Sequence, residues 1–222
     1  MKQLLKKEFT FTALPLCYLF LLFSGMTMIP GYPIAMDSFF LCLALFQSMQ
    51  SRREQNDLSY TLLLPVSKKQ VVRANYLFCI GLQMLFFLLC AILTVIRMQF
   101  LSLAAVYTEN AMMNANPVYL ANILLVFLTF NILVPGPYWK TGYGLGKPFV
   151  LFSVAALLIV TAGEILHHLP GLEGLNAPTG QGMLQIPVLL RMMRFPCSKR
   201  SIRMPSSAIS VFLISVNQNW CM

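Results

Sequence analysis

Three long stretches of this chain carry no charged side chain. Residues 9–36, 74–96 and 110–139 contain no Asp, Glu, Lys or Arg, although the chain holds 16 basic residues elsewhere. A bilayer core of roughly 30 Å is crossed by about 20 apolar helical residues, and the backbone must satisfy its own hydrogen bonds in lipid. Each stretch is long enough to span. The pattern predicts an all-α, polytopic helical membrane protein.

Composition agrees with this fold class. Hydrophobic residues make up 58% of the chain and charged residues 10%, which argues against a soluble globular domain of 222 residues. The net charge of +9 could suggest nucleic acid as a partner. The basic residues instead flank apolar stretches in short segments and are not interleaved with aromatic residues, so no nucleic-acid partner is expected.

Five transmembrane helices are expected, followed by a degraded or missing sixth. The breaks follow helix-breaking residues, such as Pro30, Gly31 and Pro33 after the first helix. The predicted domain of residues 1–190 is followed by a basic tail, residues 191–222, that is not a domain. The five spans are expected at residues 11–29, 34–50, 75–96, 118–138 and 148–166.

The connecting segments differ strongly in positive charge. Ten Lys and Arg residues fall on one predicted side and only Arg97 on the other. The positive-inside rule then predicts a cytoplasmic N-terminus. The ten residues are Lys2, Lys6, Lys7, Arg52, Arg53, Lys68, Lys69, Arg73, Lys140 and Lys147.

A signal peptide is the competing interpretation of the N-terminal region, since a basic stretch precedes an apolar one. No A-x-A cleavage pattern is present, and Leu14 to Cys17 lacks the small residues of a lipoprotein signal. Residues 1–9 fit an interfacial helix better, with apolar residues on one face and lysines that meet anionic headgroups. An unstructured basic start is the alternative.

Motifs for cofactor, metal or nucleotide binding are incomplete. Four of the six cysteines lie in spans as small buried residues, and no C-x-x-C pair occurs. Residues 142–147 resemble a phosphate loop, but Thr141 and Pro148 stand where the motif needs Gly and Ser or Thr. Glu164, His167 and His168 share a helix face without a second ligand cluster, so a polar helix end is favoured over a metal site. No catalytic residue, cofactor or metal is expected in this chain.

Two acidic residues are candidates for a polar path through the membrane. Asp37 lies near the outer end of the second predicted span, and Glu164 lies near the end of the fifth. Ionisable residues at membrane depth are costly and often functional. Contact of Asp37 with lipid headgroups is the alternative.

The segment of residues 52–75 is the strongest local signal. Its apolar run of Leu62, Leu63, Leu64 and Val66 beside Tyr60 is unusual for a solvated loop, and it should be covered by membrane or by a partner. A reentrant turn packed on neighbouring spans is the alternative.

A helix start follows this apolar run. Ser67 and Gln70 form an S-x-x-Q capping box that begins the helix continuing into the third span. The segment is therefore expected to be a short rigid element joined directly to a membrane helix.

The same segment resembles the integral membrane subunits of type-2 ABC transporters, in a bacterial permease family. Further similarity lies in residues 30–33, 131–135 and 138–149, and in Glu164 with Pro170. The resemblance covers about residues 1–190. The residues that carry it in the segment are Glu54, Asn56, Asp57, Tyr60, Leu64, Pro65, Val66, Ser67, Lys68, Lys69, Val72, Arg73 and Ala74.

This resemblance implies a six-helix permease of the bacterial cytoplasmic membrane that forms a substrate path. A separate ABC ATPase subunit would bind ATP and drive transport, usually export, and a second permease subunit would pair with this one as a homodimer or heterodimer. The segment would be the element that touches the ATPase. The partner-binding residues so implied are Glu54, Asn56, Asp57, Tyr60, Leu63, Leu64, Pro65, Val66, Ser67, Lys68 and Lys69.

Two other classes stay open. A membrane scaffold or sensor needs no polar path, and a membrane-embedded enzyme needs convergent acids and histidines that Asp37 and Glu164 do not visibly supply.

The tail raises a separate hypothesis. Its apolar start at residues 186–190 is interrupted by five basic residues between positions 191 and 203, each costing roughly 2.5 to 3.5 kcal/mol at the centre of a span. We therefore expect that a frameshift near codon 190 has replaced the sixth helix, with a disordered or peripheral tail as the alternative.

Overall fold

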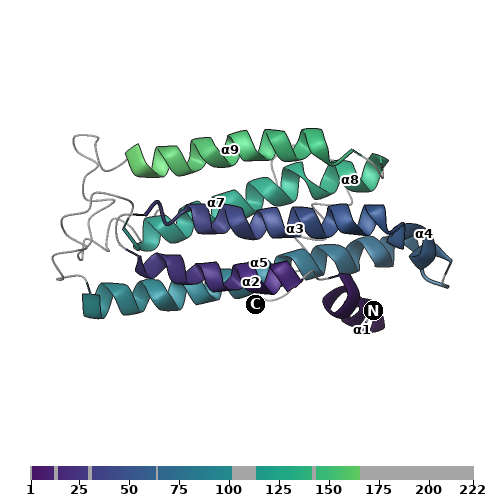
Figure 1. The fold of residues 1–222 in the computed structure, drawn as a ribbon, viewed down its shortest axis with the longest axis horizontal. Coiled ribbons are helices and arrows are strands. Elements are labelled where there is room, and N and C mark those ends of the chain that lie inside the picture. Colours follow the sequence, from purple (N-terminus) through teal and green to yellow (C-terminus); the bar gives the residue numbers. More distant parts are fainter. Residues whose placement is uncertain are drawn as a thin grey trace, which may run out of the picture.

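The computed structural model describes residues 2–12, 15–29, 32–63, 65–101, 114–141 and 144–165. Every regular element within these ranges is a helix. Short α1 and the π-helical turn η1 come first, and they precede the helices of the main bundle (Figure 1). The elements are α1 Lys2–Lys7, η1 Glu8–Thr12, α2 Pro15–Leu21, the 3₁₀ segment η2 Leu22–Met28, α3 Met36–Glu54, α4 Asp57–Leu62, α5 Lys68–Ile96, the π-helical η3 Arg97–Leu101, α7 Pro117–Leu133, α8 Pro135–Thr141 and α9 Gly146–Ile165.

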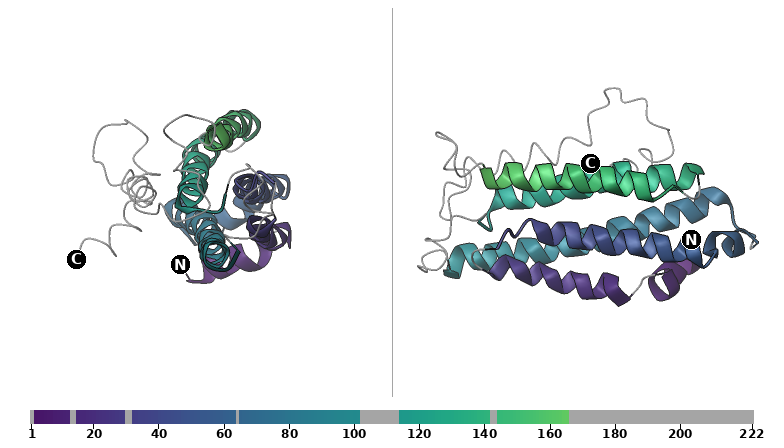
Figure 2. Two further views of the ribbon diagram at one scale, coloured as in Figure 1. Left: turned by 90° about the vertical axis from the view of Figure 1, so that its left-hand side faces the viewer. Right: turned by 45° about the horizontal axis from the view of Figure 1, so that its top comes forward.

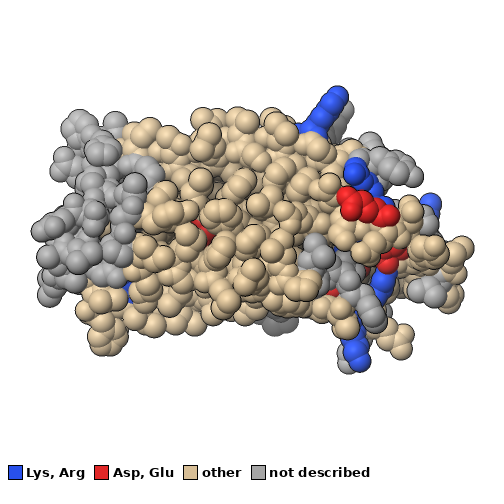
Figure 3. Space-filling model, in the orientation of Figure 1, with Lys and Arg blue, Asp and Glu red and all other residues tan. Residues whose placement is uncertain are grey.

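The long helices run side by side along the long axis of the molecule (Figures 1 and 2). Helix α7 packs against α9, α5 and α3, while α2 packs against α3 and η2 packs against α5. Short α1 and α4 lie near one end of this bundle, beside the start of α5 (Figure 1). We call this the charged end, because most of the visible Lys, Arg, Asp and Glu side chains gather there (Figure 3).

Local sequence signals set the ends of two long helices. The Ser67 side chain accepts a hydrogen bond from the Gln70 amide at 3.3 Å, and the Ser67 amide donates to Gln70 Oε1 at 3.2 Å. The predicted capping box is therefore confirmed. At the start of α7, Asn116 Oδ1 accepts from the Tyr119 amide at 2.8 Å, and Pro117 occupies the first turn.

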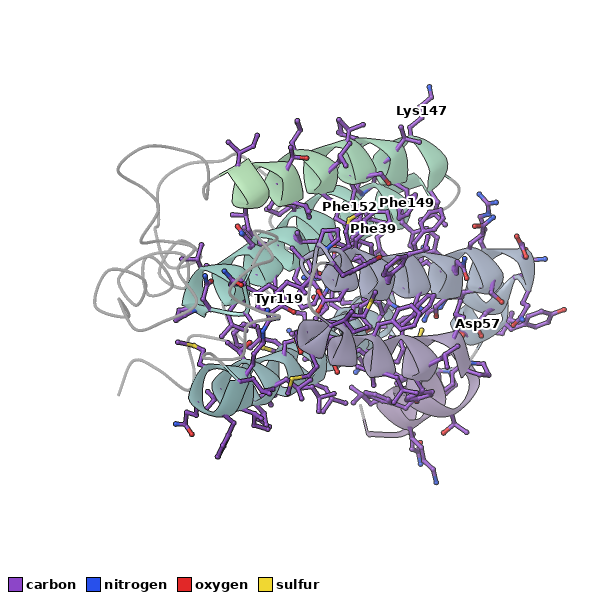
Figure 4. All side chains as sticks on the ribbon, turned by 60° about the vertical axis from the view of Figure 1, so that its left-hand side comes forward. Phe39, Asp57, Tyr119, Lys147, Phe149 and Phe152 are labelled. Carbon is purple, nitrogen blue, oxygen red and sulfur yellow. The ribbon has the colours of Figure 1, made fainter. Side chains whose placement is uncertain are left out.

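Aromatic side chains fill the space between α3, α7 and α9. Phe39 stacks on Phe152 with ring centroids 5.9 Å apart, and Phe130 meets Phe152 edge to face at 5.2 Å. Phe46 stacks on Phe149 at 3.8 Å. Figure 4 shows Phe39, Phe149 and Phe152 converging between their helices. This layer holds α9 against the rest of the bundle.

The outer faces of α5 and α9 are apolar. On α9, Leu157 and Leu158 are exposed, as are Leu88 and Ile92 on α5. The visible flank of the bundle is nearly free of charge between its ends (Figure 3). Such a surface suits lipid and would be unfavourable in water. The prediction of a multi-pass helical membrane protein agrees with this surface.

Three of the described helices are long and apolar enough to cross a membrane: Lys68–Leu101, Pro117–Trp139 and Gly146–Gly163. They correspond to the third, fourth and fifth predicted spans. The first predicted span, residues 11–29, contains the helical segment Pro15–Met28, which meets the preceding segment Gln3–Thr10 at 79°. This bent pair brings the total to four if it counts as one span. Five spans are therefore not confirmed.

Helix α3 corresponds to the second predicted span, residues 34–50. Its 19 residues would extend about 28 Å at the rise of an α-helix, which is close to spanning length. It is nevertheless absent from the candidate spans, because Asp37 lies at one end and Arg52, Arg53 and Glu54 at the other. Helix α3 thus combines an apolar middle with charged ends.

Candidate functional site

Helix α4 forms a short projection at the charged end. It follows α3 after a turn of two residues, Gln55 and Asn56, and Asn56 has a positive φ of 51°. Asn tolerates this left-handed conformation better than most residues. A tight left-handed turn therefore reverses the chain from α3 into α4.

The outer side of α4 exposes apolar side chains. Tyr60 is 68% exposed and Leu63, at the C-terminal cap of α4, is 82% exposed. Pro65, Lys68 and Lys69 are also exposed, whereas Val66 is half-buried. We call Tyr60 and Leu63 the apolar patch. The predicted apolar run is thus only partly visible, since Leu64 and the Leu62 side chain lie outside the described residues.

The inner side of α4 is tied to the N-terminal segment. Lys7 Nζ donates to Asp57 Oδ1 at 2.6 Å and also to the hydroxyl of Thr61. Thr61 is buried. Figure 4 shows Asp57 at the charged end. The sequence predicted that Lys7 meets lipid headgroups, but its ammonium group pairs with α4 instead.

A buried ion pair lies behind this contact. Glu8 and Arg52 pair through Arg52 Nη2, and each side chain is 2% exposed. When the Asn75 amide is oriented with its oxygen toward Arg52, that oxygen accepts hydrogen bonds from Arg52 Nη2 at 2.9 Å and from Nη1 at 2.7 Å. Arg52 Nε lies 4.0 Å from Asp57 Oδ2. We call Lys7, Glu8, Arg52, Asp57 and Asn75 the anchor cluster.

Sequence reasoning did not identify this cluster as a site. It named Asp57 but omitted Lys7, Glu8, Arg52 and Asn75. One signal was present: Glu8 is the only acidic residue before Asp37, in a start segment that is otherwise basic. Its partner lies 44 residues away, and no local spacing rule links them.

Asp37 lies fully inside the bundle. Its carboxylate accepts from the Tyr119 hydroxyl at 2.5 Å and from the Ser38 amide at 2.5 Å, and Cys90 Sγ lies 3.7 Å away. These contacts join α3, α5 and α7. Asp37 is 0% exposed, so the alternative of headgroup contact is wrong for this conformation. We call Asp37, Tyr119 and Cys90 the interior cluster (Figure 4 labels Tyr119).

Other polar side chains also lie between α5 and α7. Asn131 Nδ2 donates to Gln83 Oε1 at 2.7 Å. Gln83 Nε2, Asn131 Oδ1 and Thr94 Oγ1 are buried, and they have no hydrogen-bond partner among the described residues. Unpaired polar atoms at membrane depth are costly and need water or a ligand. Glu164 belongs to α9, but its side chain lies outside the described residues.

The described residues bear on the metal and cysteine predictions in part. Cys17, Cys42, Cys79 and Cys90 are buried, as expected for thiols inside spans. No group of three or more His, Cys, Asp or Glu residues able to hold a metal occurs within the described ranges. His167, His168, Cys197 and Cys221 fall outside those ranges, so the arguments about them stay predictions.

Comparison with known proteins gives a family. The protein-family model described as ABC-2 family transporter protein matches residues 3–214, nearly the whole chain. No curated protein and no solved structure matches this chain. The apolar helices and this match define a membrane permease of the ABC transporter class. The chain belongs to the ABC-2 transporter family, whose members are membrane components of transport and are not themselves enzymes.

The matched range extends past the domain boundary predicted at residue 190 and into the basic tail. The tail lies outside the described residues. The boundary and the frameshift hypothesis therefore stay predictions.

Proposed function

We propose that this permease binds a separate ABC ATPase subunit through α4. One observation carries the proposal: the apolar patch is exposed at the charged end. On its other side, the same helix is fixed to Lys7 through Asp57 and Thr61. A helix that is held firmly on one side and presents Tyr60 and Leu63 on the other is suited to contact a partner.

The remaining residues of the proposed contact surround this patch. Glu54 and Asn56 precede α4, and both are exposed. Pro65, Ser67, Lys68 and Lys69 are exposed where α5 begins, with Val66 half-buried among them. The lysines would meet acidic groups of the ATPase, while Tyr60, Leu63 and Leu64 would fill apolar pockets.

Within the membrane, the interior polar groups would line part of a substrate path. Asp37 and Gln83 are buried between packed helices, and Asn131 bonds Gln83. Among the described residues, Gln83 Nε2 and Asn131 Oδ1 have no hydrogen-bond partner. Glu164 is proposed for the same path at the far end of α9. ATP would be bound by the ATPase, and no cofactor by this chain. We further propose that the transport is export, and that a second permease subunit pairs with this one.

The charged end would face the cytoplasm of a bacterial cell, which puts α4 on the side where ATP is present. Cysteines introduced singly at Ser59 and Thr141, in a chain without native cysteines, should resist a membrane-impermeant thiol reagent in intact cells. Labelling at either position before the cells are opened would contradict this orientation.

Co-purification tests the contact itself. The tagged permease should retain an ABC ATPase in detergent, and Leu63→Asp should remove it by inserting a charge into the apolar patch. Leu63→Met is the matched control, since it keeps an apolar side chain of similar volume. Equal retention by Leu63→Asp and Leu63→Met would contradict the assignment of α4.

A further inference from the structure

Arg52 joins three segments that are far apart in the sequence. It lies in the last turn of α3, and it bonds Glu8 of η1 and Asn75 of α5. The side chains of Arg52 and Glu8 are almost fully excluded from solvent. A buried charge pair of this kind is strongly destabilised when one partner is removed, so the three segments are held in one arrangement.

The same guanidinium group also faces α4. Its Nε atom is buried and has no hydrogen-bond partner within the described part of the chain, and Asp57 Oδ2 lies 4.0 Å from it. Asp57 meanwhile accepts from Lys7, on the segment that also carries Glu8. Asp57 is therefore held by Lys7 and lies within the field of Arg52.

The covalent connection from α3 to α4 is a poor transmitter of movement by itself. It consists of Gln55 and Asn56, and α4 has only six residues. A force applied to Tyr60 or Leu63 could turn α4 about this short connection without moving α3. The ion pairs of Asp57 with Lys7 and Arg52 oppose such a rotation, because they act on the inner side of α4.

We propose that Arg52 is the positioning residue that joins α4 to α3 and to the membrane-spanning helix α5. A displacement of α4 by the bound ATPase then moves both helices, and η1 moves with them through Glu8. This role rests on the proposed function, since it needs an ATPase at the apolar patch. Arg52 itself is buried, so its proposed role is to position α4 and not to contact that partner.

Variants can separate this role from simple stabilisation. Arg52→Gln alone leaves Glu8 buried without its cation. Glu8→Gln combined with Arg52→Gln removes both charges, and Asn75 keeps a polar neighbour, so the double variant should recover most of the stability. It still lacks a charge that attracts Asp57. Arg52→Lys keeps the charge without the forked geometry of the guanidinium group.

The experiment uses the permease–ATPase complex in lipid nanodiscs. Spin labels are attached at Val95 on α5 and Ile165 on α9, two exposed positions at the end opposite α4. The six native cysteines are replaced, and labelled chains are diluted into unlabelled ones. Double electron–electron resonance spectroscopy then gives the distance between the labels before and after trapping with ATP and vanadate.

In the wild type, trapping should shift this distance. Glu8→Gln with Arg52→Gln should retain the ATPase and lose the shift, and Arg52→Lys should give an intermediate shift. Lys6→Gln removes an exposed charge from the same segment and should behave as wild type. A full shift in the double variant, or no shift in the wild-type complex, overturns the role of Arg52. A wild-type chain that retains no ATPase overturns the proposed function and this role with it.

Discussion

The anchor cluster and the interior cluster solve the problem of buried charge in different ways. In the anchor cluster, Glu8 and Lys7 pair with Arg52 and Asp57 across long separations in the sequence. In the interior cluster, Asp37 receives hydroxyl, amide and thiol contacts, and no described Lys or Arg forms an ion pair with it. The first is a set of matched charges, and the second is a single acid.

This difference matters for function. Matched charges lock segments together, and they lie at the end where α4 projects from the bundle. The single acid, Asp37, has only neutral donors around it among the described residues, and in the proposed path it would meet polar groups of a substrate. The two clusters are both connected to α5, through Asn75 and Cys90.

The largest effect is expected from breaking the ion pair of the anchor cluster. Arg52→Gln leaves Glu8 buried and unpaired, and it should lower the free energy of unfolding by about 3–5 kcal/mol. Denaturant titration of the purified chain in detergent measures this change. The control combines Arg52→Gln with Glu8→Gln and should be much closer to wild type. A single variant as stable as the double variant would show that the pair does not hold the segments.

A smaller effect is expected in the interior cluster. Tyr119→Phe removes one donor from Asp37 but no charge, and it should cost about 1–3 kcal/mol in the same titration. Tyr18→Phe serves as a control, since its hydroxyl donates to the Phe9 carbonyl from an exposed position. If Tyr119→Phe costs as much as Arg52→Gln, the two clusters do not differ as described.

The next prediction concerns the capping box at the start of α5, the helix that contributes a residue to each cluster. Ser67→Ala removes the acceptor of the Gln70 amide, and it should cost about 1 kcal/mol. Hydrogen exchange of the Gln70 amide should become faster, because that donor loses its partner. Ser67→Asp keeps an acceptor and should preserve the protection. Faster exchange in Ser67→Asp as well would argue against the capping contact.

The smallest effect is expected from the partly exposed pair. Lys7 and Asp57 have side chains that are 25% and 23% exposed, so solvent weakens their attraction. Lys7→Gln should cost no more than about 1 kcal/mol, and added salt should reduce the difference from wild type. Lys6→Gln is the matched control. A loss comparable to that of Arg52→Gln would mean that Lys7 is the main anchor of α4.

Much of the helical framework could be predicted from the sequence, because its causes are local. The charge-free stretches predicted α5 and α7 with α8, and the apolar residues of the predicted fifth span, 148–166, predicted α9. The residues Ser67 and Gln70 predicted the start of α5. Burial of the cysteines in spans followed from their apolar neighbours. These features depend on periods and spacings within one segment.

The clusters could not be predicted in the same way. Glu8 and Arg52 are 44 residues apart, and Asp37 and Tyr119 are 82 apart, so only the packing of helices brings them together. The 79° bend between Gln3–Thr10 and Pro15–Met28 is a feature that a hydropathy count does not register. Helix α3 was predicted to span the membrane but is not among the spanning helices, because its ends are charged. Asp37 of the interior cluster lies at one end, and Arg52 of the anchor cluster lies at the other.

The central claim is that the apolar patch of α4 contacts an ATPase subunit. A photo-crosslinking amino acid placed at Leu63 in living cells tests it most directly, with Val95 on the far end of α5 as the control position. The account predicts that the product from position 63 contains a protein whose peptides carry the G-x-x-x-x-G-K-[ST] motif of a phosphate loop, and that position 95 gives no such product. Crosslinks from position 63 only to lipid or to other permease chains would contradict it.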